Sequence, residues 1–146
     1  MRDAIIDEAQ RWVGTPYRHQ AAAFQLGCDC VGLIRGVGFN VGALPPEPEK
    51  WKQFNAYGRL PNPARMAEGM RTFLRPVTSE PQHGDVAWLS WREDLPMHLA
   101  LLARYPRGRE TLIHCYSDIG RVVEHGLTAE WRGRVHSWWR YPGAPE

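Results

Sequence analysis

The chain contains the stretch Gly27-Cys28-Asp29-Cys30-Val31-Gly32-Leu33-Ile34, in which a polar loop passes into an apolar run of small residues. Such a run can begin a helix that enters the core, and Cys30 would then lie in its first turn. The free N–H groups and the positive dipole at a helix N-terminus favour thiolate over thiol. Cys30 is therefore a candidate nucleophile at the start of a central helix, although a lone buried cysteine is more often inert packing.

Length and composition predict one globular domain over residues 1–146. The chain is 43% hydrophobic and 23% charged, which is ordinary for a domain with its own core. No apolar run approaches the roughly 18 residues of a membrane span, and the acidic N-terminus MRDAIIDEAQ does not resemble a secretory signal. We therefore expect no membrane span and synthesis in the cytoplasm without a signal peptide.

Charge and cysteine usage argue against a nucleic-acid-binding protein and against a disulfide-rich protein. The net charge is only +2 and the arginines are scattered, so we expect no direct contact with nucleic acid. Arginine suits bidentate contacts to carboxylates, which leaves an acidic substrate or protein partner open. The number of cysteines is odd, and Cys28 and Cys30 are too close for an ordinary disulfide framework. A reduced environment with at least one free thiol fits this pattern.

Helical patterns come first along the chain and strand patterns later, which predicts an α+β fold with an antiparallel sheet. Apolar spacing indicates helices over 4–13, 30–41 and 64–74. Alternation indicates strands over 84–90, 97–103, 111–116, 121–124 and 135–141. The proline-rich excursion 44–63 either covers one side of a cleft or simply wraps the surface.

The predicted central helix contains Gly32, Gly36 and Gly38. Each glycine costs roughly 1 kcal/mol relative to alanine in a helix interior. Glycines are tolerable there if another element packs closely against the helix. We therefore expect tertiary contacts, rather than helix propensity, to hold it.

The segment between the strands 97–103 and 111–116 can form a hairpin turn. A turn centred near Pro106 or Arg107 would place His98 opposite His114, or one diagonal step from it, on the same face. Cross-strand neighbours of this kind have Cβ atoms about 5 to 8 Å apart. The two imidazoles are therefore expected within hydrogen-bonding reach.

These residues suit a thiol mechanism. His98 would act as general base and then as general acid to the leaving amine. His114 would fix the tautomer and orientation of His98. The backbone N–H of Cys30 would receive the oxyanion, with help from Tyr17, which approaches the cysteine from a loop. The alternative for Tyr17 is a core or surface aromatic.

Other readings of the remaining residues stay open. Cys115 is expected in the core, and Cys28 is incidental unless oxidation makes it regulatory. A zinc site of Cys28, Cys30, His98 and His114 is the metal alternative, although Cys-x-Cys lacks the usual ligand spacing. We otherwise expect no metal and no cofactor. Histidines with no assigned role are His19, His83, His125 and His136. Trp138 and Trp139 should point to opposite faces of the sheet, one into the core.

Five short motifs follow one another along the chain. They are Gly14-Thr15-Pro16-Tyr17, Asp29-Cys30-Val31-Gly32-Leu33, Gly84-Asp85-Val86, His98-Leu99-Ala100-Leu101 and Ile113-His114. In order and character they resemble the NlpC family of papain-like cell-wall cysteine peptidases. The resemblance implies a papain-like fold, with N-terminal helices packed on an antiparallel sheet and the nucleophile at the N-terminus of the central helix.

The resemblance also implies an activity. The catalytic set would be a Cys-His-His triad of Cys30, His98 and His114, with Tyr17 by the oxyanion and substrate amine and Asp29 beside the substrate. The reaction would be hydrolysis of amide bonds in peptidoglycan stem peptides, typically the D-γ-glutamyl–diamino acid bond. Many bacterial members have serine where this chain has Val31, which leaves the exact bond open.

The compact length and the form Asp-Cys-Val-Gly look most like the phage-type branch of the family. That branch is encoded with tail genes of phages and gene transfer agents. This implies phage-like tail or baseplate proteins as partners and delivery to the host cell wall in a virion tail, where the enzyme would aid local wall penetration during DNA delivery. The alternative is a structural tail or baseplate component that keeps the fold without requiring the activity, with Trp138, Trp139 and the proline-rich excursion as contact surfaces.

Overall fold

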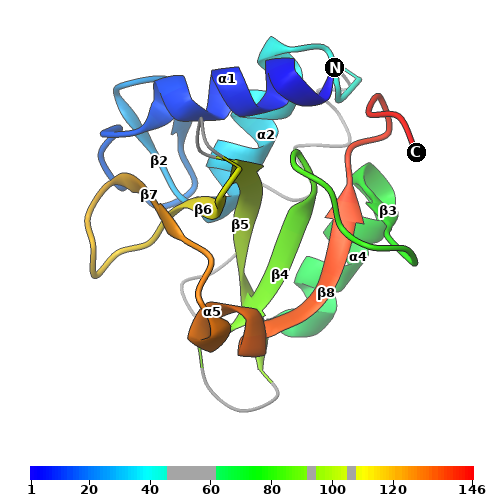
Figure 1. Cartoon of the computed structure of the whole chain (residues 1–146). Helices are drawn as coiled ribbons and strands as arrows, with labels where there is room; N and C mark the ends of the chain where they lie inside the picture. Colours follow the sequence, from blue (N-terminus) through cyan, green and yellow to red (C-terminus); the bar gives the residue numbers. More distant parts are fainter. Residues whose placement is uncertain (46–61, 92–94, 105–107) are drawn as a thin grey trace.

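The computed structural model describes residues 1–45, 62–91, 95–104 and 108–146. Its helices are α1 (Arg2–Trp12), α2 (Cys30–Asn40), α4 (Pro63–Phe73) and the short α5 (Ala129–Gly133). The longer strands are β4 (Val86–Ser90), β5 (Pro96–Arg104), β6 (Glu110–Cys115), β7 (Val122–Gly126) and β8 (Val135–Arg140). Two-residue strands are β1 (Ala22–Ala23), β2 (Gly27–Cys28) and β3 (Arg75–Pro76). Figure 1 follows these elements along the chain.

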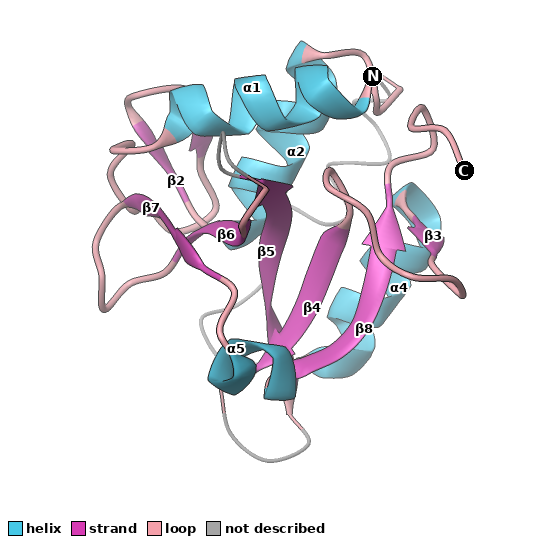
Figure 2. Ribbon diagram, in the orientation of Figure 1, coloured by secondary structure: helices cyan, strands magenta, loops and turns pink. Residues whose placement is uncertain are grey.

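The main sheet is antiparallel and has the strand order β3-β8-β4-β5-β6-β7. Helices α1 and α2 lie together at one end of this sheet, and α5 joins β7 to β8 at the other (Figure 2). The α+β prediction is confirmed, with the three long helices and five long strands within a few residues of their expected bounds. The sequence did not indicate α5 or the two-residue strands. Most of the proline-rich excursion 44–63 lies outside the described residues.

Close packing explains the glycines of α2. A Cβ atom on Gly32 would overlap the carbonyl oxygen of Ala21, and one on Gly36 would overlap the indole of Trp12. The loop before α2 and the end of α1 therefore both approach the helix more closely than any other residue allows. This confirms the expectation that tertiary contacts hold the central helix.

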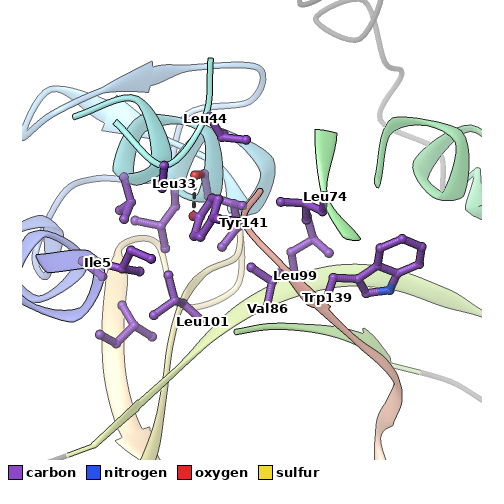
Figure 3. Packing of buried hydrophobic residues seen from close by; sticks show 14 of the residues in the cluster. Ile5, Leu33, Leu44, Leu74, Val86, Leu99, Leu101, Trp139 and Tyr141 are labelled. Carbon is purple, nitrogen blue, oxygen red and sulfur yellow. Dashed lines mark hydrogen bonds between the residues drawn. The ribbon is translucent and has the colours of Figure 1, made fainter. Parts of the chain in front are cut away.

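The main core fills the space between the helices and one face of the sheet. Its centre includes Ile5 of α1, Leu33 of α2, Leu101 of β5 and Tyr141 (Figure 3). The Tyr141 hydroxyl donates to the carbonyl oxygen of Ile34 at 2.6 Å, so the end of β8 is fastened to α2. The core thus ties the helix that carries Cys30 to the sheet.

A smaller cluster covers the other face of the sheet. It is formed by Ala87, Leu89, Ala100 and Leu112, with Leu127, Trp131, Val135 and Trp138 packed against it. Trp139 belongs instead to the main core, so the two neighbouring tryptophans point to opposite faces as predicted. Within the described residues, no helix has the length and apolar character needed to cross a membrane.

A buried carboxylate joins the two ends of the chain. Asp85 is fully buried and accepts two hydrogen bonds from Arg140, both at 2.8 Å, and one from Arg2 at 3.1 Å. Burial opposes ionisation of this carboxyl, but the hydrogen bonds from Arg140, Gln82 and Arg2 outweigh it and lower the pKa of Asp85. The charged form of Asp85 is therefore part of the folded state.

Replacing Asp85 by asparagine should lower the free energy of unfolding by about 3–5 kcal/mol, because two arginines would be left buried without their carboxylate. Urea denaturation at neutral pH measures this. The pKa of Asp85 is lowered by folding, so its contribution is present above the unfolded pKa. The difference between wild type and variant should therefore shrink as the pH falls below about 4. Asp3→Asn, at an exposed carboxylate, is the control; equal small effects of both substitutions would contradict this role.

Candidate active site

Asp29 caps the helix that carries the candidate nucleophile. Its backbone is extended, and one carboxylate oxygen accepts the N–H of Gly32 at 2.8 Å. The other oxygen accepts the N–H of Gln20 at 2.8 Å, and the residue is only 4% exposed. Asp29 thus fixes both the first turn of α2 and the loop before it. This capping role is an addition to the predicted one; its place beside the substrate stays a prediction.

Cys30 is the first residue of α2 and is partly buried. Two backbone N–H groups, those of Leu99 and Val31, interact with its sulfur and favour the thiolate. Leu99 belongs to β5 and directly follows His98. The start of α2 is therefore docked on β5 at the position where the candidate base emerges.

The structure brings His98 and His114 together. Their atoms Nε2 and Nδ1, respectively, are 2.8 Å apart, and the residues are 3% and 0% exposed. Because Leu101 pairs with Ile113 across the β5–β6 ladder, His98 lies one diagonal step from His114. Of the two registers that the sequence allowed, the diagonal one is found. The nitrogen Nε2 of His98 is engaged with His114, which leaves Nδ1 for a reacting group.

A third imidazole extends this pair. The Nε2 atoms of His114 and His125 are 2.6 Å apart, and Nδ1 of His125 lies 2.9 Å from the carbonyl oxygen of Gly126. His125 had no predicted role because it shows no paired pattern in the sequence, and the strand was expected to end at Glu124. The strand in fact runs to Gly126, which puts His125 on the same face as His114. A register count across β6 and β7 could have found it.

Aromatic rings surround the three histidines. The ring of Trp91 lies 4.7 Å from that of His98 and 4.9 Å from that of Tyr116. The ring of Trp131 lies 5.1 Å from His114 and 4.7 Å from His125. Arg134 stacks over both tryptophans. Within this shell His98 and His114 are almost fully buried, whereas His125 is half-buried.

Burial controls the charge state of the site. It raises the pKa of Cys30 to about 12, and the neighbouring Asp29 carboxylate adds to the rise. Burial also places the pKa of His98 well below its usual value and lowers that of His114 to about 3, each helped by repulsion from the next histidine. The expected lowering of the thiol pKa is thus wrong for the free protein. The N–H groups of Leu99 and Val31 favour the thiolate, but desolvation outweighs them.

The resting pair should accordingly be a neutral thiol and a neutral imidazole. The difference in ultraviolet thiolate absorbance between wild type and Cys30→Ala reports on the Cys30 sulfur. We expect this difference to show no step at a pH of about 8.5, the ordinary thiol pKa, because the charged sulfur would be desolvated. Alkaline titration of both proteins measures this difference. A full thiolate signal at neutral pH that disappears in His98→Ala would instead reveal a resting ion pair.

Tyr17 lies beside the segment that precedes Cys30. Its backbone forms an isolated parallel bridge with Cys28, and its N–H donates to the carbonyl oxygen of Gly120 at 2.9 Å. The side chain is half-buried and packs against the main core. This position supports a packing role; the predicted contact with an oxyanion or substrate amine stays a prediction.

The other two cysteines lie together in the core. Cys28 and Cys115 are fully buried, and the Cys115 thiol donates to the carbonyl oxygen of Cys28 at 3.4 Å. The core position predicted for Cys115 is confirmed. The Cys28 thiol interacts with the Cys115 side chain. This contact does not support the alternative zinc site, in which Cys28 would be a ligand together with Cys30 and the two histidines. Among the described ranges, no group of three or more histidine, cysteine or acidic side chains is arranged to hold a metal ion.

No family model and no curated protein matches the sequence. A solved structure described as similar to a lipoprotein of the NLP/P60 family, from Staphylococcus aureus, matches with a TM-score of 0.60 and 22% identity. The match covers 96% of this chain but only 41% of that one. The NlpC/P60 domain of the peptidoglycan hydrolase SagA matches with a TM-score of 0.56 and 18% identity, over 96% of this chain and 97% of that domain.

The fold of this chain is that of NlpC/P60 domains. The predicted papain-like arrangement is therefore confirmed, with α2 as the central helix and Cys30 at its N-terminus. At such low identity the likeness establishes the NlpC/P60 fold alone. The chemistry has to be argued from the residues that this fold brings together.

Proposed function

We propose that this chain is an NlpC-type cysteine peptidase that cleaves amide bonds in peptidoglycan stem peptides. The observation that carries the proposal is the docking of Cys30 on β5 beside a buried, hydrogen-bonded His98–His114 pair. A thiol at a helix start next to an oriented imidazole is the arrangement that nucleophilic acyl transfer needs. The fold shared with a domain of a peptidoglycan hydrolase supports the substrate class.

The proposed reaction starts from the neutral pair. Nδ1 of His98 takes the thiol proton as the Cys30 sulfur attacks the amide carbonyl, and the backbone N–H of Cys30 stabilises the oxyanion, with Tyr17 assisting. The carbon–nitrogen bond then breaks, the amine leaves with the proton from His98, and a thioester remains. Water attacks the thioester with His98 as base, which releases the acid and restores the thiol. His114 keeps the His98 ring in place throughout.

Two substitutions test these roles. Cys30→Ala should abolish release of amino groups from purified peptidoglycan, because no other group can form the thioester. His98→Ala should lower kcat by about 10²- to 10⁴-fold through loss of acid–base catalysis. His136→Ala, at an exposed histidine of β8, is the matched control and should retain activity. Folded Cys30→Ala that digests peptidoglycan at the wild-type rate would refute the assignment.

The cleaved bond and the setting are further parts of the proposal. We propose that the enzyme cleaves the D-γ-glutamyl–diamino acid bond. We also propose that a phage-like tail delivers it to the host cell wall and that its partners there are tail or baseplate proteins. The support is the likeness of Asp29-Cys30-Val31-Gly32 to the phage-type branch. Of the contact surfaces expected for a purely structural role, Trp139 is buried in the main core and Trp138 is partly buried against the second cluster, while most of the proline-rich excursion lies outside the described residues.

Particles carrying Cys30→Ala separate the enzymatic from the structural role. If the chain acts as an enzyme, these particles should assemble normally, because one sulfur atom is lost, yet deliver DNA poorly through an intact cell wall. Particle counts by electron microscopy and DNA transfer into walled and wall-weakened cells measure both. Normal transfer by the variant, with failed assembly when the protein is omitted, would instead favour the structural component. Absence of the protein from purified particles would refute tail association.

A further inference from the structure

The three histidines form one continuous hydrogen-bonded chain that ends on the backbone. It runs from His98 through His114 to His125 and then to the carbonyl oxygen of Gly126, with separations of 2.8, 2.6 and 2.9 Å. We infer that His125 is a positioning residue that sets the tautomers of both His114 and His98. The consequence for catalysis rests on the proposed function; the effect on the tautomers does not.

The direction of the chain follows from its last member. A carbonyl oxygen can only accept, so Nδ1 of His125 carries a proton and donates to Gly126. In neutral His125 the other nitrogen, Nε2, then has a free lone pair and accepts the Nε2–H of His114. Nδ1 of His114 is in turn the acceptor for the Nε2–H of His98. The lone pair of His98 is thereby placed on Nδ1.

This outcome is the one that general-base catalysis requires. A His98 ring protonated on Nδ1 could not take the proton of the Cys30 thiol through that nitrogen. Burial keeps His98 and His114 neutral, so each ring has one donor and one acceptor and the order cannot reverse at a single ring. The peptide carbonyl of Gly126 thus fixes a proton position on His98 through two intervening imidazoles.

The surroundings of His125 hold its ring for this task. Leu112 of β6 pairs with His125 of β7, and His114 pairs with Val123, so His125 is the diagonal neighbour of His114 on the same face. Trp131 of α5 lies against both rings, at 5.1 Å from His114 and 4.7 Å from His125. The ladder and the indole together limit rotation of the His125 ring.

Two substitutions at His125 distinguish this role from packing. Glutamine can place an amide oxygen near the position of Nε2 and still accept from His114, whereas leucine fills space without an acceptor. Histidine ¹⁵N spectra of the wild type should show His98 protonated on Nε2 and bare on Nδ1. His125→Leu should give a mixture of His98 tautomers, and His125→Gln should restore the wild-type pattern. His136→Leu is the matched control and should leave the spectrum of His98 unchanged.

We expect the two variants to differ in catalytic rate in the same way as in their tautomers. His125→Leu should lower kcat on stem peptides by about tenfold to a hundredfold with little change in KM, less than the roughly 10⁴-fold loss that a fully wrong tautomer causes. His125→Gln should recover most of the rate. A folded His125→Leu protein with wild-type tautomers of His98 would overturn the inference, as would equal loss in the glutamine and leucine variants. The spectra need no substrate, so an inactive wild type with the expected tautomers would refute only the proposed function.

Discussion

The docking of the first turn of α2 on strand β5 is the contact on which the candidate site depends. Gly32 lets the preceding loop touch the helix, and Asp29 binds that loop and the first turn at once. The Cys30 sulfur then interacts with the backbone N–H of Leu99, the residue that follows His98 in β5. Because Tyr141 fastens the same helix to the end of β8, a shift of α2 would disturb the core as well as the site.

Burial gives this contact its chemical character. The same packing that positions Cys30, His98 and His114 removes water from them, so the charged forms of all three are disfavoured. A buried imidazole is costly unless its nitrogens are paired. The hydrogen-bonded chain through His125 pairs both nitrogens of His114 and Nε2 of His98, and it leaves only Nδ1 of His98 for the reacting group. Polar satisfaction and catalytic orientation are therefore met by the same bonds.

Much of this could be predicted from local patterns. The change of period from helix to strand gave the α+β fold, and the spacing of His98 and His114 around one turn gave their proximity. The charge state of Cys30 and the place of His125 were not predicted correctly, because both depend on burial and distances that the sequence does not give. The helix start favours a thiolate, but only the depth of burial shows that desolvation outweighs it at Cys30. His125 was missed because it shows no paired pattern in the sequence, and the strand that carries it was predicted to end two residues early.

The proposed thiol chemistry has one most direct measurement. A stem-peptide fragment whose scissile carbonyl is part of a diazomethyl ketone alkylates a cysteine only where the thiol, the base and the substrate cleft meet. Mass spectrometry of the labelled protein should find the adduct on Cys30 alone, suppressed by excess stem peptide and greatly slowed in His98→Ala. Equal slow labelling of Cys28, Cys30 and Cys115, or turnover of stem peptides by protein whose Cys30 is fully blocked, would contradict it.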